Sequence, residues 1–181
     1  MIGNSKGFTL VELLVVITIM GIIGAFVVAN YRSFGENQSL KSDVLNIQNI
    51  FRQAQTDAST NAQCDNTGST GYSATWQLDF YPGFVYLKCK RPASQPTLKK
   101  TLTLADGIEI QSSSGGLCPI SSDSFAGLTI KFAPLTGKID FFNFNGDEFP
   151  ECKELTIGLV NHKTENTQYL IIEKGGRVYG E

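Results

Sequence analysis

A single carboxylate, Glu12, interrupts a run of otherwise uncharged and mostly apolar residues from Phe8 to Ala29. Placing a carboxylate in lipid costs at least about 2.5 kcal/mol, so an acidic residue in such a run predicts a specific partner. The nearest basic residues are unsuitable, because Lys6 points elsewhere on a helix and Arg32 lies about five turns further along. We expect the partner of Glu12 on another chain, and the alternative is that Glu12 lies at a lipid–water interface.

Four cysteines follow the apolar run, at Cys64, Cys89, Cys118 and Cys152. Their separations of 25, 29 and 34 residues contain no Cys-x-x-Cys pair, which argues against a zinc site. An even number behind an export signal favours disulfides in an oxidising compartment. Three pairings are open, and the shorter loops favour Cys64 with Cys89 and Cys118 with Cys152. The alternative is that some are buried free thiols.

Several basic side chains gather between residues 88 and 100, and Arg177 lies near the C-terminal end of the sequence. The candidate DNA contacts are Lys88, Lys90, Arg91, Lys99, Lys100 and Arg177. Clustered Lys and Arg attract phosphates in a salt-sensitive and sequence-independent way. Because no aromatic residues interleave with this run to stack on bases, a solvated loop is the favoured interpretation.

Two further groups of polar residues invite a chemical interpretation. The segment 143–148 combines amide and carboxylate oxygens, which calcium prefers, but its glycine is misplaced for an EF-hand, so an Asn-Gly turn with exposed acids is favoured. His162 is the single histidine and is expected at the surface, since no nucleophile or metal-binding motif accompanies it. We expect no catalytic residue, no metal and no cofactor, although sequence alone leaves a hydrolytic carboxylate pair open.

The elements that position these residues begin with a long helix. The apolar run of 22 residues would extend roughly 33 Å as a helix, enough to cross a bilayer. It is longer than the apolar region of a cleaved secretory signal and continues directly into a helical pattern. Apolar residues then recur every three or four positions, at Leu40, Val44, Ile47, Phe51, Ala54 and Ala58. We expect one helix from about Phe8 to about Ala62, with one buried face in its second half.

Beyond Cys64 the pattern changes to short strands. Strict alternation over 72–80 predicts a strand with one buried face, with Trp76 in the core, and Pro82-Gly83 turns the chain into a second strand over 84–90. Further strands are expected over 101–104, 108–111, 128–133, 138–144, 155–161, 168–173 and 177–179. Tight turns between short strands imply antiparallel sheets, and the helix must cover one face, so the expected fold class is α+β.

The stretch Lys6-Gly7-Phe8-Thr9-Leu10-Val11-Glu12 resembles the prepilin signal of type IV pilins and type II secretion pseudopilins. The resemblance implies that a prepilin peptidase cuts between Gly7 and Phe8 and methylates the new amine of Phe8. In a stack of parallel helices, that cation can meet Glu12 of a neighbouring subunit, so that two charges costly in lipid neutralise each other. Gly7 and Phe8 are then the processing residues, and Phe8 and Glu12 the assembly residues.

The same resemblance implies a pilin-like organisation. Its parts are a leader peptide over 1–7, a transmembrane helix half over 8–29, an amphipathic helix half over 30–62 and a β-rich head over 63–181. The implied partners are prepilin peptidase, other pilin or pseudopilin subunits, an inner-membrane assembly platform and membrane lipid. The implied location is the bacterial inner membrane, with the head outside the cytoplasm, and a pilus or pseudopilus after assembly.

A looser resemblance extends over the C-terminal half. The segments 128–137, 155–157 and 171–178 are similar to H-type minor pseudopilins and FimT-like minor pilins, which implies a minor filament subunit that is not an enzyme. Some FimT-like pilins bind DNA through a Gly-Arg-x-Arg motif, whereas this chain has Gly176-Arg177-Val178-Tyr179 and lacks the second arginine. A DNA-binding minor pilin for natural transformation is one alternative function, and a membrane-anchored extracellular enzyme is another.

Overall fold

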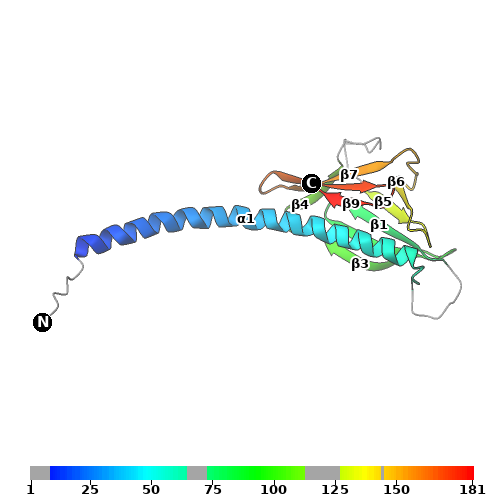
Figure 1. The fold of residues 1–181 in the computed structure, drawn as a ribbon, viewed down its shortest axis with the longest axis horizontal. Coiled ribbons are helices and arrows are strands. Elements are labelled where there is room, and N and C mark those ends of the chain that lie inside the picture. The colour runs from blue at the N-terminus through cyan, green and yellow to red at the C-terminus, as the bar shows by residue number, and fades with distance from the viewer. Residues whose placement is uncertain (1–8, 65–72, 113–126, 144) are drawn as a thin grey trace. The chain divides into compact units, whose positions relative to one another are not determined.

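The computed structural model describes residues 9–64, 73–112, 127–143 and 145–181, with the backbone alone at 27–33 and 112. These residues form one long helix, α1 (Leu10–Ser59), and nine strands (Figure 1). The strands are β1 (Thr75–Tyr81), β2 (Phe84–Lys90), β3 (Thr97–Thr103), β4 (Ile108–Ser112), β5 (Leu128–Phe132), β6 (Ile139–Asn143), β7 (Glu154–Asn161), β8 (Asn166–Glu173) and β9 (Val178–Gly180). The expected α+β, pilin-like fold of a long N-terminal helix and antiparallel sheets is confirmed.

The strands form two antiparallel sheets. One has the order β3-β2-β1-β5-β6, and the other has the order β4-β7-β8-β9. β1 and β2 pair with Tyr81 opposite Phe84, so Pro82-Gly83 is the two-residue turn that the sequence predicts. β3 begins at Thr97 instead of the expected Thr101, because it pairs with β2 as far as Cys89 through a register shift at Leu87/Lys88.

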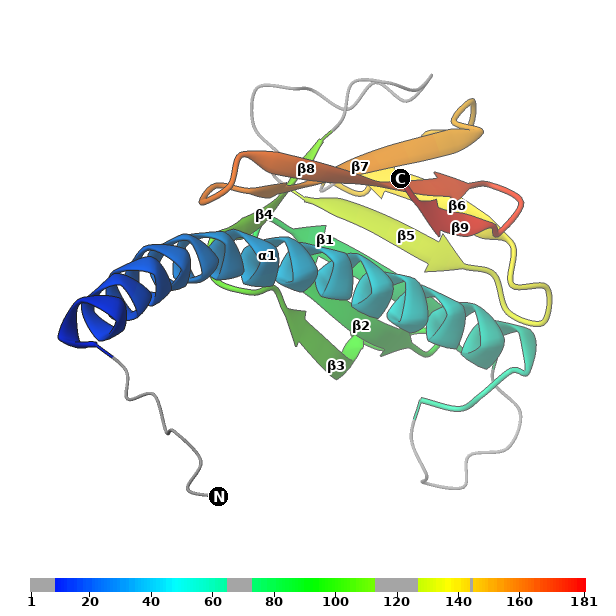
Figure 2. The ribbon, with the colours of Figure 1, turned by 60° about the vertical axis from the view of Figure 1, so that its left-hand side comes forward.

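The chain divides into two compact units, residues 1–36 and residues 37–181. Within the second unit, the C-terminal part of α1 lies across the five-stranded sheet (Figure 2). The six apolar helix positions expected in the core, from Leu40 to Ala58, are all at most 4% exposed, and Ile50 joins them. Phe51 is fully buried and packs edge-on against Phe132 of β5, with ring centroids 5.1 Å apart. The periodicity of the sequence therefore identified the buried face of this helix.

The edge strand of the second sheet, β9, and the turn before it lie against α1. A Cβ atom on Gly180 would come within 2.9 Å of Val44 Cγ1, and one on Gly176 within 2.2 Å of Gln55 Nε2. Gly176 also has a φ of +91°, in the region that glycine tolerates best. Two glycines thus allow the close approach of helix and strand.

The alternation expected for β1 is only partly correct. Trp76, Leu78 and Phe80 are buried as expected, but Gln77 and Asp79 on the other face are also buried, at 9% and 6% exposure. Asp79 accepts hydrogen bonds from Thr129 Oγ1 at 2.8 Å and from Gln77 Nε2 at 3.2 Å, and it forms an ion pair with Lys88 Nζ at 2.7 Å. Neighbouring strands therefore supply polar partners that make burial of this carboxylate tolerable.

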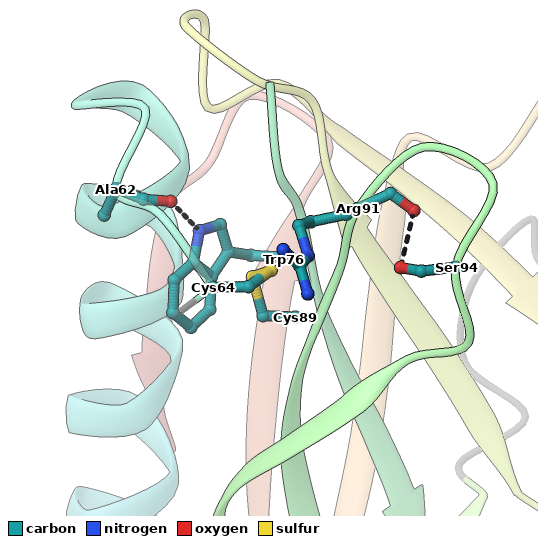
Figure 3. Close-up of a disulfide and its surroundings, with 6 residues drawn as sticks. All are labelled: Ala62, Cys64, Trp76, Cys89, Arg91 and Ser94. Atoms are coloured by element: carbon teal, nitrogen blue, oxygen red, sulfur yellow. Dashed lines mark hydrogen bonds between the residues drawn. A yellow bond between two sulfur atoms is a disulfide. The ribbon is translucent and has the colours of Figure 1, made fainter. Parts of the chain in front are cut away.

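A disulfide links the segment after α1 to β2 (Figure 3). Cys64 is bonded to Cys89, with Cα atoms 5.5 Å apart, as the shorter loop predicts. Beside it, Trp76 Nε1 donates a hydrogen bond to the carbonyl of Ala62 at 3.2 Å. Cys152 is also disulfide-bonded, and none of the described cysteines is a free thiol. Cys118 lies outside the described residues, so its pairing with Cys152 stays a prediction.

Asp43 departs from the expectation that polar residues of the amphipathic helix face solvent. It is 7% exposed, and its Oδ2 accepts a hydrogen bond from the backbone N–H of Ala105 at 2.8 Å. Burial raises the pKa of the Asp43 carboxyl above its ordinary value of 3.8, and the Ala105 hydrogen bond opposes only part of that rise. Because the pKa of Asp43 is higher in the folded state than in the unfolded state, the protonated carboxyl makes its full contribution to the stability of the fold below pH 3.8. That contribution is lost as the pH rises through the pKa of the folded state.

We expect Asp43→Asn to remove this pH-dependent loss, because the amide keeps an acceptor oxygen for Ala105 but does not ionise. Relative to the wild type, the free energy of unfolding of Asp43→Asn should rise between pH 4 and pH 7, as measured by urea denaturation at each pH. Asp43→Ala is the matched control: relative to Asp43→Asn it should lose about 1–3 kcal/mol at every pH, because neither residue ionises and the Ala105 N–H loses its acceptor. A difference between wild type and Asp43→Asn that does not change with pH would contradict this account.

Candidate functional site

The start of α1 positions the carboxylate that the sequence singles out. Thr9 caps the helix, since its Oγ1 accepts a hydrogen bond from the N–H of Glu12 at 3.2 Å and its carbonyl accepts one from the N–H of Leu13 at 3.2 Å. Thr9-Leu10-Val11-Glu12 has the spacing of a capping box, in which an acid three residues after the cap suits the positive end of the helix dipole. This spacing was visible in the sequence, and it gives Glu12 a local structural role beside the expected role in assembly.

The Glu12 side chain is exposed. Within the part of the chain that the structure describes, no cation lies within ion-pair distance of its carboxylate. The expected processing residues, Gly7 and Phe8, lie outside the described residues. The pairing of Glu12 with an amine on another chain therefore stays a prediction.

The first turns of α1 carry large apolar side chains that face outward in every direction. Exposure is 79% for Leu10, 68% for Met20 and 70% for Phe26. The other large apolar residues more than one third exposed in this stretch are Val11, Leu13, Leu14, Val15, Val16, Ile17, Ile19, Ile22 and Ile23. A helix that is apolar on all sides needs lipid or other helices around it. Residues 10–26, called the apolar stem below, are thus a surface that requires a partner.

By the criteria of length and mean hydropathy, none of the helices formed by the described residues could cross a membrane.

The candidate DNA contacts do not form one surface. Lys88 is engaged with Asp79 and lies over the Tyr86 ring, 5.4 Å from its centroid. Burial lowers the pKa of Lys88, but the hydrogen bond and charge of Asp79, with smaller effects of Tyr81 and Tyr86, outweigh it and raise the pKa above its ordinary value. Lys88 therefore stays charged and held in place, and its role in the structure is to neutralise Asp79.

The other basic residues lie in two separate places. Lys90 ends β2, Arg91 follows it, and Lys99 and Lys100 are exposed on the edge strand β3. Arg177 lies in the turn between β8 and β9 of the other sheet, and β3 and β9 are on opposite sides of α1 (Figure 2). The structure therefore separates Arg177 from the other four basic residues, Lys90, Arg91, Lys99 and Lys100.

The remaining polar groups have structural roles. Asn143 and Asp147 close the turn after β6 with two hydrogen bonds of 2.8 Å, and Gly146 has a φ of +89°. This agrees with the turn that the sequence favours, and no group of three or more metal-ligating side chains occurs among the described residues. His162 is at the surface as expected, with its Nε2 3.1 Å from Glu109 Oε2.

Comparison with known proteins identifies a family motif near the start of the chain. Residues 2–28 match the family model described as the prokaryotic N-terminal methylation motif. No curated protein and no solved structure matches the chain. The matched segment contains Gly7, Phe8 and Glu12, and it supports a precursor of the type IV pilin or pseudopilin kind. The motif implies processing by prepilin peptidase and assembly with other pilin subunits.

Proposed function

We propose that this chain is a minor pilin or pseudopilin, a subunit of a type IV pilus or type II secretion filament. The observation that carries the proposal is the methylation motif over residues 2–28, which leads directly into the exposed apolar stem. A capped helix with apolar side chains on all sides has the form expected of a filament core, where neighbouring helices cover one another. The buried face of α1 from Leu40 to Ala58 supports a head built around the same helix.

In this proposal the chain is held in the bacterial inner membrane before assembly, with its head outside the cytoplasm. Cleavage after Gly7 creates a cationic amine at Phe8, and Glu12 of an adjoining subunit neutralises it. Each charge alone is costly in an apolar environment, so the pair favours the assembled state over the separate subunits. The side chains from Leu10 to Val28 then supply the packing surface between helices.

Mass spectrometry of the purified mature protein tests the proposal at its first step. We expect a chain that begins at Phe8 and carries one methyl group on its terminal amine, because the motif places the cleavage after Gly7. Gly7→Glu should accumulate as the full-length precursor, since a bulky acidic side chain replaces the small residue at the cut. A wild-type protein that retains Met1 would contradict the proposal.

The alternative of a DNA-binding minor pilin has weaker support. The engagement of Lys88 with Asp79 and the separation of Arg177 from β3 leave no continuous basic groove among the described residues.

A further inference from the structure

A pocket of about 490 Å³ lies between α1 and the β8–β9 turn of the second unit. Its lining residues are Arg52, Gln55, Gly176, Arg177, Val178 and Tyr179. Two guanidinium groups, a side-chain amide and a phenol hydroxyl give it many hydrogen-bond donors and two positive charges, and no carboxylate lines it. The chemistry of the lining therefore suits an anion.

The two arginines have donors to spare. Arg52 is exposed on α1 and forms no ion pair with any described residue. Arg177 is 77% exposed, and Glu173 Oε1 lies 3.7 Å from its Nη1, beyond hydrogen-bond distance. An arginine can bind a carboxylate through two parallel hydrogen bonds, and neither of these side chains already does so with a described residue.

Gly176 is part of the construction of this pocket. The Gln55 side chain lies where a Cβ atom of residue 176 would be, and the positive φ of Gly176 turns the chain so that Arg177 and Tyr179 follow along the pocket wall. The pocket therefore lies where Gly176 and Gly180 allow the β8–β9 turn and β9 to approach α1 closely.

The surroundings of the pocket select against a polyanion. Partial burial raises the pKa of the Tyr179 phenol, the charges of Glu154, Glu173 and Glu181 raise it further, and Arg177 opposes them. These carboxylates repel any anion in proportion to its charge, so they oppose the successive phosphates of DNA more strongly than a single carboxylate that two arginines bind.

We propose that the Arg52–Arg177 pocket binds a carboxylate side chain of an acidic peptide segment on an adjoining subunit. This inference rests on the proposed filament function, because it gives the head a contact with its neighbour in addition to the helix packing. The chain itself shows what such a segment looks like, since Asp147, Glu148 and Glu151 are exposed in the connection between β6 and β7. Such a contact joins different surfaces of two subunits, which is the type that builds open helical assemblies.

The test uses the full-length chain, labelled with ¹⁵N and purified in detergent, and a synthetic peptide with the sequence of residues 145–151. We expect the peptide to shift the backbone amide signals of residues 176–179, and its amidated form, with Asn and Gln in place of the acids, to leave them unchanged. Arg52→Gln and Arg177→Gln should each weaken binding about tenfold, the loss expected for a charge-assisted hydrogen bond. Lys100→Gln, which removes a charge on β3, is the matched control and should bind like the wild type.

Three results would overturn the inference. The first is that the peptide shifts no amide signal of residues 176–179. The second is that Lys100→Gln weakens peptide binding as much as the arginine variants do. The third is that the chain binds duplex DNA through the two arginines and does not bind the acidic peptide. Processing at Gly7 and incorporation into filaments are measured separately, so failure of this pocket leaves the proposed function standing. Conversely, a chain that is never processed could still bind the peptide.

Discussion

Glu12→Gln is expected to reduce incorporation of the chain into filaments by about a hundredfold or more, while the processed protein still accumulates. In the proposed filament, the substitution would leave the Phe8 amine of the adjoining subunit without its counter-charge, and removing one partner of a buried ion pair costs about 3–5 kcal/mol. The measurement is the ratio of filament-associated to membrane-associated chain in sheared and fractionated cells that express each variant at equal levels.

Glutamine is the informative replacement because it suits the third position of a capping box as well as glutamate does. Glu12→Gln therefore preserves the local hydrogen-bonding pattern at the start of α1 and removes only the charge. Thr9→Ala is the matched control, because it removes the cap, at a cost of about 1 kcal/mol, and keeps the charge. If Glu12→Gln assembled normally, or if Thr9→Ala lost assembly to the same extent, Glu12 would act through the helix end and not through an ion pair.

Phe51→Ala is expected to lower the free energy of unfolding of the second unit by about 3–5 kcal/mol, the usual cost of deleting a buried aromatic ring. Phe51 is fully buried between α1 and β5, where it packs against Phe132. Denaturant unfolding of the full chain can be followed by the fluorescence of Trp76, which is buried beside the end of α1 and is the single tryptophan.

Leu45→Ala is the control for that experiment, because Leu45 is on the same helix and 57% exposed. Its substitution should change the free energy of unfolding by less than about 0.5 kcal/mol, since it removes little buried surface and alanine favours helices. Equal effects of the two substitutions would show that the buried face of α1 does not hold the second unit together.

The elements of this fold are largely encoded by local pattern. Each of the nine strands formed by the described residues overlaps a segment that the sequence predicts as a strand, and the buried apolar positions of α1 from Leu40 onward follow the helical repeat. The methylation motif is likewise a contiguous signal, so the class of precursor is readable without coordinates. The ends of elements are less certain because pairing partners decide them, as β3 shows by following β2 beyond its expected start.

The burial of charged side chains could not be predicted from local sequence pattern. Asp79 alternates with apolar neighbours just as an exposed residue would, and Asp43 shares a helix face with Leu40 and Ile47 although its charge predicts exposure. Both are buried because distant segments supply Ala105, Thr129 and Lys88 as partners. Lys88, one of the candidate DNA contacts, likewise forms an ion pair with Asp79 that local pattern does not predict.

The sequence by itself determined the long helix, the approximate positions of the strands and the processing signal, because each depends on residues within a few positions of one another. Only the tertiary structure decided that Cys64 pairs with Cys89 and that Arg52 and Arg177 line one pocket, because 25 residues separate the first pair and 125 the second. Such pairs meet only when helix and sheets pack around a common core, and that packing depends on the sum of many contacts that no local pattern contains.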